Sequence, residues 1–167
     1  AMRRFFVLVA AAAAATTALA ASVGAIGINS SQQDRAASKT GRDAKIVRAV
    51  RAVLDAQVAA WNRGDIDGFM DGYMRGPDTV FISGDHLTRG WQTVLDRYKK
   101  SYDSREKMGT LSFLEIEIKP LGRDAAIAFG RWQLARAADA PHGRFTLTFR
   151  RTREGWRIVH DHTSSAT

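Results

Sequence analysis

The pattern of apolar and polar residues divides the chain into a helical first half and a second half of strands. From Arg42 to Asn62, apolar residues recur at spacings of three and four, which predicts one amphipathic helix. From Leu111 onward the period changes to two, which predicts strands. Because the helices precede the strands instead of alternating with them, the pattern favours an α+β domain.

Shorter elements are predicted between these two regions. Asp65 is placed to cap a second helix, which ends at the turn Gly76-Pro77-Asp78. A short strand over Thr79–Ser83 and a turn over Gly84–His86 follow, and a third helix spans Trp91–Tyr102. The chain therefore supplies three N-terminal helices with apolar stripes that need a sheet face to bury them.

Four long antiparallel strands are predicted to form that sheet. The first is Leu111–Lys119, the second is Ala125–Ala137, and the last two form a hairpin within Gly143–Ser164. The apolar phase slips by one residue near Phe113 and Leu114, which indicates a β-bulge. The predicted loops are 101–108, 120–124 and 138–141. We expect a single domain with the helices covering one face of a curved sheet.

The N-terminal segment has the plan of a secretory signal peptide over residues 1–20. Arg3 and Arg4 precede an apolar run, and Ala18-Leu19-Ala20 matches a signal-peptidase site. Ala1 precedes Met2 and is expected to be foreign to the natural chain. The alternative, a membrane anchor, is disfavoured because the apolar run is short and rich in alanine. We therefore expect a periplasmic or secreted protein without a stable membrane anchor after cleavage, with a flexible tether over residues 21–41.

The net charge and the cysteine content limit how the domain can be stabilised and which partners it can bind. The formal net charge is +8 and there is no Cys, so the exported domain must be held by its core or by an oligomer interface. The Lys and Arg residues are scattered along the chain, so a nucleic-acid partner is not expected. No Gly-rich phosphate loop is present, and no cofactor is expected.

Two histidines near the end of the chain are the candidate catalytic residues. A period of two places His160 and His162 on the same strand face as Trp156 and Ile158, with Asp161 on the opposite face. An imidazole on a cavity wall can act as a general acid or base. Ligand hydrogen bonding and a structural role remain alternatives. No metal is expected, because the other two histidines, His86 and His142, lie in predicted turns.

Several stretches of the sequence resemble one family. They are Ala60–Asp65, Val80–Gly84, Gly130–Trp132 and, above all, GRFTLTFRRTREGWRIVHDHTS over residues 143–164. Together they resemble the SnoaL-like domain of the nuclear transport factor 2-like superfamily, which also holds ketosteroid isomerases and polyketide cyclases. The resemblance covers residues 43–164, and the domain is expected over residues 42–164. It implies a cone, in which a curved antiparallel sheet wraps around three N-terminal helices and encloses an apolar cavity, and a homodimer formed through the outer sheet face.

The resemblance leaves the function open between two classes. Ketosteroid isomerases need a carboxylate on the first strand and a Tyr on the first helix, and Thr79–Ser83 and Arg42–Asn62 supply neither. We expect a domain that binds a small, largely apolar molecule. It is either an acid–base enzyme of the isomerase, cyclase or hydrolase type, or a non-catalytic ligand-binding or protein-association module. The expected ligand-binding residues are Tyr73, Phe81, Ser83, Tyr98 and Trp132.

Overall fold

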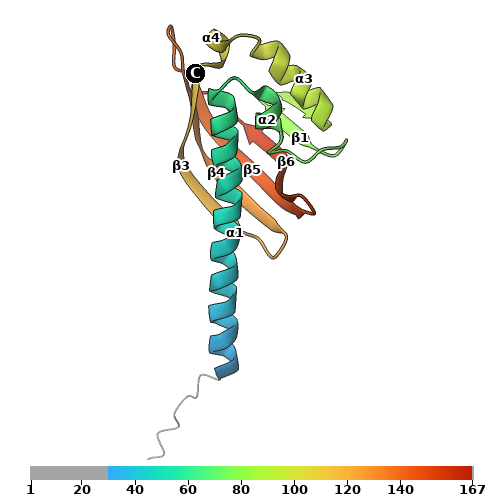
Figure 1. The fold of residues 1–167 in the computed structure, drawn as a ribbon, viewed down its shortest axis with the longest axis vertical. Helices are drawn as coiled ribbons and strands as arrows, with labels where there is room; N and C mark the ends of the chain where they lie inside the picture. Colours follow the sequence, from blue (N-terminus) through green and yellow to red (C-terminus); the bar gives the residue numbers. More distant parts are fainter. Residues whose placement is uncertain (1–29, 167) are drawn as a thin grey trace, which may run out of the picture.

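Helix α1, Ser30–Asn62, runs along the concave side of a curved six-stranded sheet (Figure 1). This arrangement is seen in a computed structural model that describes residues 30–166. The predicted apolar stripe of α1 is the face that the sheet covers, since Val50 and Leu54 are fully buried and Trp61 is 2% exposed. The predicted α+β architecture, a curved sheet around N-terminal helices, is confirmed.

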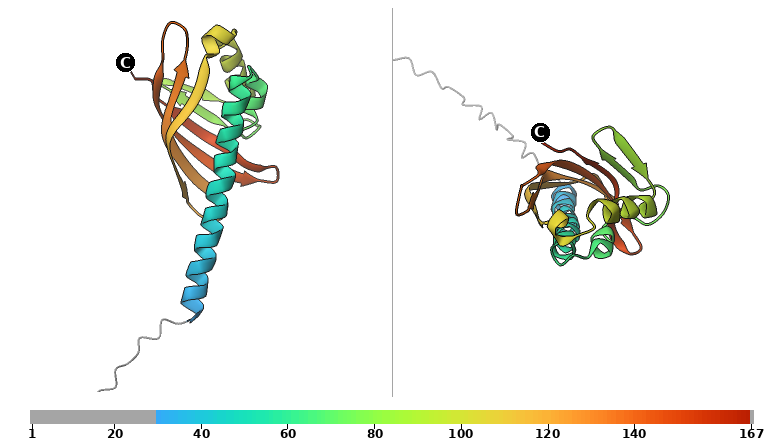
Figure 2. Two further views of the ribbon diagram at one scale, coloured as in Figure 1. Left: turned by 60° about the vertical axis from the view of Figure 1, so that its left-hand side comes forward. Right: turned by 90° about the horizontal axis from the view of Figure 1, so that it is seen from above.

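The start of α1 corrects the prediction of a flexible tether. Residues 30–41 continue the helix, so the tether prediction is wrong from Ser30 onward. This segment carries no apolar stripe, but it is rich in Ala, Gln, Lys and Arg, which favour helix where a stable helix already follows. Figure 2 shows that the early turns of α1 project beyond the sheet. The predicted signal peptide and residues 21–29 lie outside the described residues.

Three shorter helices close the wide end of the cone. Helix α2, Ile66–Met70, is capped by Asp65, whose carboxylate accepts a hydrogen bond from the Gly68 N–H at 2.7 Å, as predicted. Helix α3 spans Trp91–Ser101. A short helix α4, Arg105–Met108, lies where a loop was predicted.

The sheet has the strand order β2-β1-β6-β5-β4-β3. Its strands are β1 Val80–Ser83, β2 His86–Arg89, β3 Thr110–Pro120, β4 Ala125–Ala135, β5 His142–Thr152 and β6 Gly155–Thr163. Strand β2 was not predicted, because the turn after β1 is shorter than expected and His86 already pairs with Ser83. The sheet is also not fully antiparallel, since β1 pairs with β6 in parallel.

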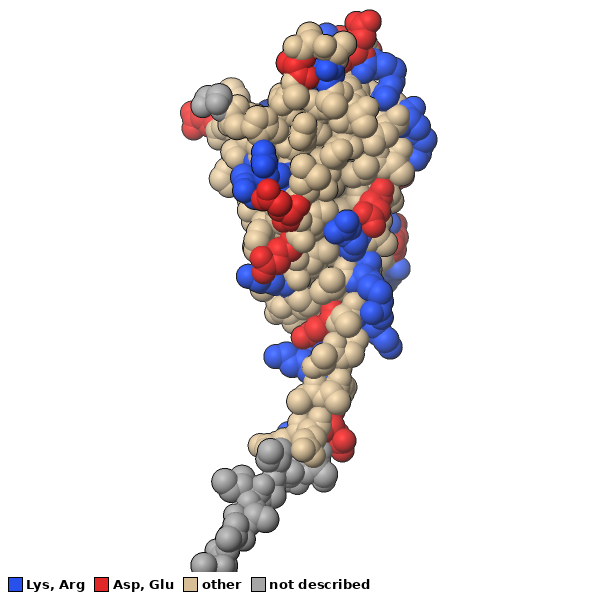
Figure 3. Space-filling view, turned by 90° about the vertical axis from the view of Figure 1, so that its left-hand side faces the viewer, with Lys and Arg blue, Asp and Glu red and all other residues tan. Residues whose placement is uncertain are grey.

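The surface of the cone is mixed in charge. In Figure 3 acidic and basic side chains lie close to one another in small groups, with uncharged areas between them. Many of them form exposed ion pairs, such as Arg51 with Asp55 at 3.0 Å and Lys119 with Glu117 at 2.9 Å. Within residues 30–166, no helix is both long and apolar enough to cross a membrane.

Candidate functional site

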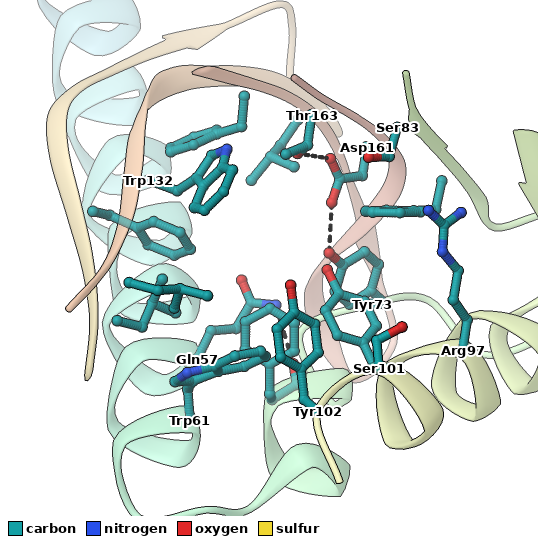
Figure 4. A pocket seen from close by; sticks show the side chains of 18 of the residues that line it. Gln57, Trp61, Tyr73, Ser83, Arg97, Ser101, Tyr102, Trp132, Asp161 and Thr163 are labelled. Atoms are coloured by element: carbon teal, nitrogen blue, oxygen red, sulfur yellow. Dashed lines mark hydrogen bonds between the residues drawn. The ribbon is translucent and has the colours of Figure 1, made fainter. Parts of the chain in front are cut away.

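A cavity of about 160 Å³ lies between the helices and the concave side of the sheet. Figure 4 looks into it and shows Gln57 and Trp61 on one side and Asp161 and Thr163 on the other. The five residues predicted to bind a ligand all line this cavity: Tyr73, Phe81, Ser83, Tyr98 and Trp132. The sequence thus identified five residues that lie together at this cavity, and their role in ligand binding stays a prediction.

Aromatic side chains make up nine of the nineteen residues that line the cavity. The helices and the loops that follow α2 and α3 contribute Trp61, Phe69, Tyr73, Tyr98 and Tyr102. The strands contribute Phe81, Phe113, Trp132 and Phe145. Several of these rings contact one another edge to face, as Trp61 does with Tyr102 at a centroid distance of 4.7 Å, so the helical side of the wall is a connected aromatic cluster.

Asp161 is the acidic residue of the cavity wall, and it is only 3% exposed. The Tyr73 hydroxyl donates to its Oδ2 at 2.6 Å, and the Thr163 hydroxyl donates to its Oδ1 at 2.6 Å. Burial raises the pKa of Asp161 from 3.8 to about 6, against the opposing effect of these two hydrogen bonds. The carboxyl group therefore changes protonation state close to neutral pH.

The two candidate histidines do not face the cavity, so that part of the prediction is wrong. Thr148 pairs with His160 but Phe149 pairs with Ile158, which leaves Val159 as an extra residue in β6. This bulge shifts the side-chain alternation by one position. It turns Asp161 into the cavity and His160 and His162 to the opposite face of the sheet, where His162 is exposed.

A second departure from the prediction brings Tyr73 to Asp161. Tyr73 was placed on the second helix, but α2 ends at Met70 and Tyr73 forms a bridge to Ile158 on β6. The Met74 N–H donates to the Ile158 carbonyl at 2.8 Å, and the Ile158 N–H donates to the Gly72 carbonyl at 2.8 Å. The loop after α2 is thus fixed along β6, just before the bulge that aims Asp161.

The phenols around Asp161 stay protonated. Burial raises the pKa of Tyr73 well above its ordinary value, and the nearby Asp161 charge raises it further. The pKa of Tyr98 is raised for the same two reasons. Asp161 is therefore the group in this part of the cavity that can exchange a proton near neutral pH.

Other polar residues of the cavity were missed by the sequence interpretation. They are Gln57, Arg97, Ser101, Tyr102, Thr163 and Ser165. Gln57 lies on the buried stripe of α1, and its position there, where an apolar residue is usual, was the available signal. For Asp161 the signal was the pair of adjacent apolar residues Ile158 and Val159, which breaks the period of two in β6.

Metal ligands do not gather at this site. Within the described part of the chain, no group of three or more His, Cys, Asp or Glu side chains is arranged to hold a metal ion. The polar groups beside Asp161 are hydroxyls, which are weak metal ligands without additional carboxylates or imidazoles. The arrangement suits hydrogen bonding and proton transfer.

A curved sheet around helices with an internal cavity defines the nuclear transport factor 2-like class of folds. The SnoaL-like domain family matches residues 50–167, which is most of the chain, and the chain belongs to this family. Among curated proteins, no sequence matches this chain.

Solved structures agree with this assignment. An NTF-2 like protein of unknown function from Shewanella oneidensis is 40% identical, with a TM-score of 0.68 over 71% of this chain and 98% of that chain. A ketosteroid isomerase-like protein from Erwinia carotovora is 18% identical, with a TM-score of 0.58 over 72% of this chain and 95% of that chain. The second similarity concerns the fold alone.

Proposed function

We propose that this chain binds a small, largely apolar molecule in the cavity and that Asp161 contacts the polar end of that molecule. The observation that supports this most directly is the placement of Asp161, a buried carboxyl group at the wall of a cavity in which nine of the nineteen lining residues are aromatic. Burying a carboxyl group costs stability, and such groups in cavities are often functional. The cavity volume of about 160 Å³ suits a ligand with a single small ring, since a cavity of roughly 150 Å³ holds benzene.

The same geometry supports an acid–base step on the bound molecule. A carboxyl group with a pKa of about 6 is well matched to taking up and returning a proton near neutral pH. Tyr73, which keeps its proton, stays beside it as a hydrogen-bond donor. In this proposal Asp161 takes the acid–base role that the sequence assigned to His160 and His162. The absence of an acid on β1 and of a Tyr on α1 disfavours the ketosteroid isomerase form of the reaction.

Binding can be tested with benzyl alcohol as a probe of suitable size. The chain has four Trp residues, of which Trp61 and Trp132 line the cavity, whereas Trp91 and Trp156 do not. We expect saturable chemical-shift changes in the indole N–H signals of Trp61 and Trp132, with smaller changes at Trp91 and Trp156. Equal changes at all four signals, or none, would contradict a binding site in this cavity.

A further inference from the structure

Among the described residues, the carboxylate of Asp161 forms no ion pair. Its two hydrogen-bond donors, Tyr73 and Thr163, are neutral. His162, an exposed side chain on the opposite face of the sheet, also lowers the pKa of Asp161. Buried charges in proteins are ordinarily paired, so a partner from outside the chain would complete this site.

The walls around this carboxylate suit a positive charge. In Figure 4 the rings of Trp61, Tyr73, Tyr102 and Trp132 surround an open centre. The faces of such rings attract cations, most strongly where water is excluded. The indole N–H groups of Trp61 and Trp132 donate to the backbone carbonyls of Met108 and Ser164, so these two residues offer a ligand their rings rather than a polar group.

Gln57 adds a second acceptor across the cavity. Its amide nitrogen donates to the Phe69 carbonyl at 3.0 Å, which leaves its carbonyl oxygen to accept a hydrogen bond from a ligand. Figure 4 shows Gln57 on the opposite side of the open centre from Asp161. A ligand with several N–H donors at one centre could therefore be held from two sides.

Arg97 is the basic residue among those that line the cavity, and it is held at the rim. Its Nη1 donates to the Thr88 hydroxyl on β2 at 2.9 Å, and its guanidinium lies 4.9 Å from the centre of the Phe81 ring. It is not among the causes that shift the pKa of Asp161, which are burial, Thr163, Tyr73 and His162. Arg97 therefore does not neutralise the negative charge of the Asp161 carboxylate.

We propose that the ligand is an organic cation, a protonated amine with a small aromatic or aliphatic body, whose ammonium group pairs with Asp161 inside the aromatic walls. This inference rests on the proposed ligand-binding function and specifies its ligand class. A metal ion is the other kind of cation, but the described residues form no metal-binding group here. The volume of about 160 Å³ limits the amine to roughly the size of a substituted benzene.

The test compares two probes of nearly equal shape, benzylamine, which is protonated at pH 7.5, and benzyl alcohol, which is neutral. Both are titrated into the full chain and followed at the Trp61 and Trp132 indole signals. We expect benzylamine to bind at least tenfold more tightly than benzyl alcohol. In Asp161→Asn we expect this preference to disappear. The matched control is Glu117→Gln, which removes the same charge from the outer sheet face, where Glu117 pairs with Lys119, and should keep the preference.

The possible outcomes distinguish a failure of the amine proposal from a failure of the proposed ligand-binding function. Equal affinities for the two probes, or tighter binding of the alcohol, would refute the proposal that the ligand is a protonated amine. The proposed ligand-binding function of the cavity would still hold. A preference that survives in Asp161→Asn would refute the role of this carboxylate. Failure of both probes to shift the Trp61 and Trp132 signals would refute the proposed function as well. Because these signals also report binding in the unaltered chain, the comparison of the two probes does not depend on the folding of any variant.

Discussion

Folding moves the Asp161 carboxyl from water into the cavity wall, where it is 3% exposed. A carboxyl group whose pKa rises on folding stabilises the folded state only while it is protonated. Its contribution is therefore fully present below the unfolded pKa of 3.8 and is lost as the pH rises through about 6. The rise in pKa corresponds to roughly 3 kcal/mol at most, at about 1.4 kcal/mol per pKa unit.

The substitution Asp161→Asn should therefore stabilise the protein at neutral pH. We expect its free energy of unfolding at pH 7.5 to exceed that of the unaltered chain by up to about 3 kcal/mol, because the buried charge is gone. The difference should shrink as the pH falls from 6 towards 4. Urea unfolding across this pH range would measure it. Glu117→Gln serves as the control, and a gain for Asp161→Asn that did not vary with pH would argue against the titration of Asp161 as its cause.

At the scale of elements, replacing two glycines by Ala should change the stability of the protein in opposite directions. Gly143 on β5 faces Trp132 on β4, and a Cβ at residue 143 would overlap the Ser164 carbonyl that accepts from the Trp132 indole. Gly143→Ala should destabilise the protein by about 1–3 kcal/mol, since backbone must move to admit it. Gly41→Ala meets nothing within 4 Å and lies within α1, so it should stabilise by up to about 1 kcal/mol.

Thermal and urea unfolding would show whether Gly143→Ala lowers and Gly41→Ala raises the free energy of unfolding. The Gly41 variant also tests the corrected start of α1, because a flexible tether at residue 41 would gain no stability from Ala. A stable Gly143 variant with an unchanged Trp132 indole signal would show that the end of the chain adapts to the added methyl group without displacing the cavity wall.

The elements that the sequence predicted well are those fixed by local patterns. The stripe that buries Val50 and Leu54, the Asp65 cap and the bulge after Leu114 follow from residues close together in the chain. The parallel pairing of β1 with β6 could not be predicted, because it joins residues such as Phe81 and Asp161 that are distant in sequence. Local periodicity does not encode such contacts.

The candidate site was predicted in part for the same reason. The aromatic wall followed from apolar positions that any regular element would turn inward. The acidic residue was assigned to the wrong face, because one unpaired residue, Val159, reverses the alternation just before Asp161. The contact between Tyr73 and Asp161 depends on a loop that leaves its helix early, which the helical spacing of Tyr73 concealed.

At the scale of the whole molecule, the outer face of the sheet carries half-buried apolar residues over which no other element of residues 30–166 packs. Ile127 and Phe129 on β4 and Ile82 on β1 are examples, and their positions alternate with residues that face the core. Such a face favours association. We propose that two copies pair through it, as the resemblance to the family implies, which would leave both cavities open on the opposite side of each sheet.

Sedimentation velocity over a range of protein concentrations would test this pairing. We expect the unaltered chain to sediment as a dimer and Phe129→Arg to sediment as a monomer, because a buried unpaired charge at the centre of the interface is costly. Leu121→Arg is the control, since Leu121 is 62% exposed in the turn between β3 and β4. A monomeric unaltered chain, or a dimeric Phe129→Arg variant, would exclude an interface centred on β4.

The extra residue in β6 affects how this chain should be aligned with its relatives. Site residues are usually transferred between homologues by alignment column, on the assumption that a shared column means a shared direction. Here the side chains of His160, Asp161 and His162 take their directions from the unpaired residue Val159, which precedes them in β6. A relative with the same three letters but a regular strand would present two imidazoles to its cavity instead of one carboxylate. A one-residue insertion or deletion in this strand can therefore change the chemistry of the cavity without any substitution at His160, Asp161 or His162.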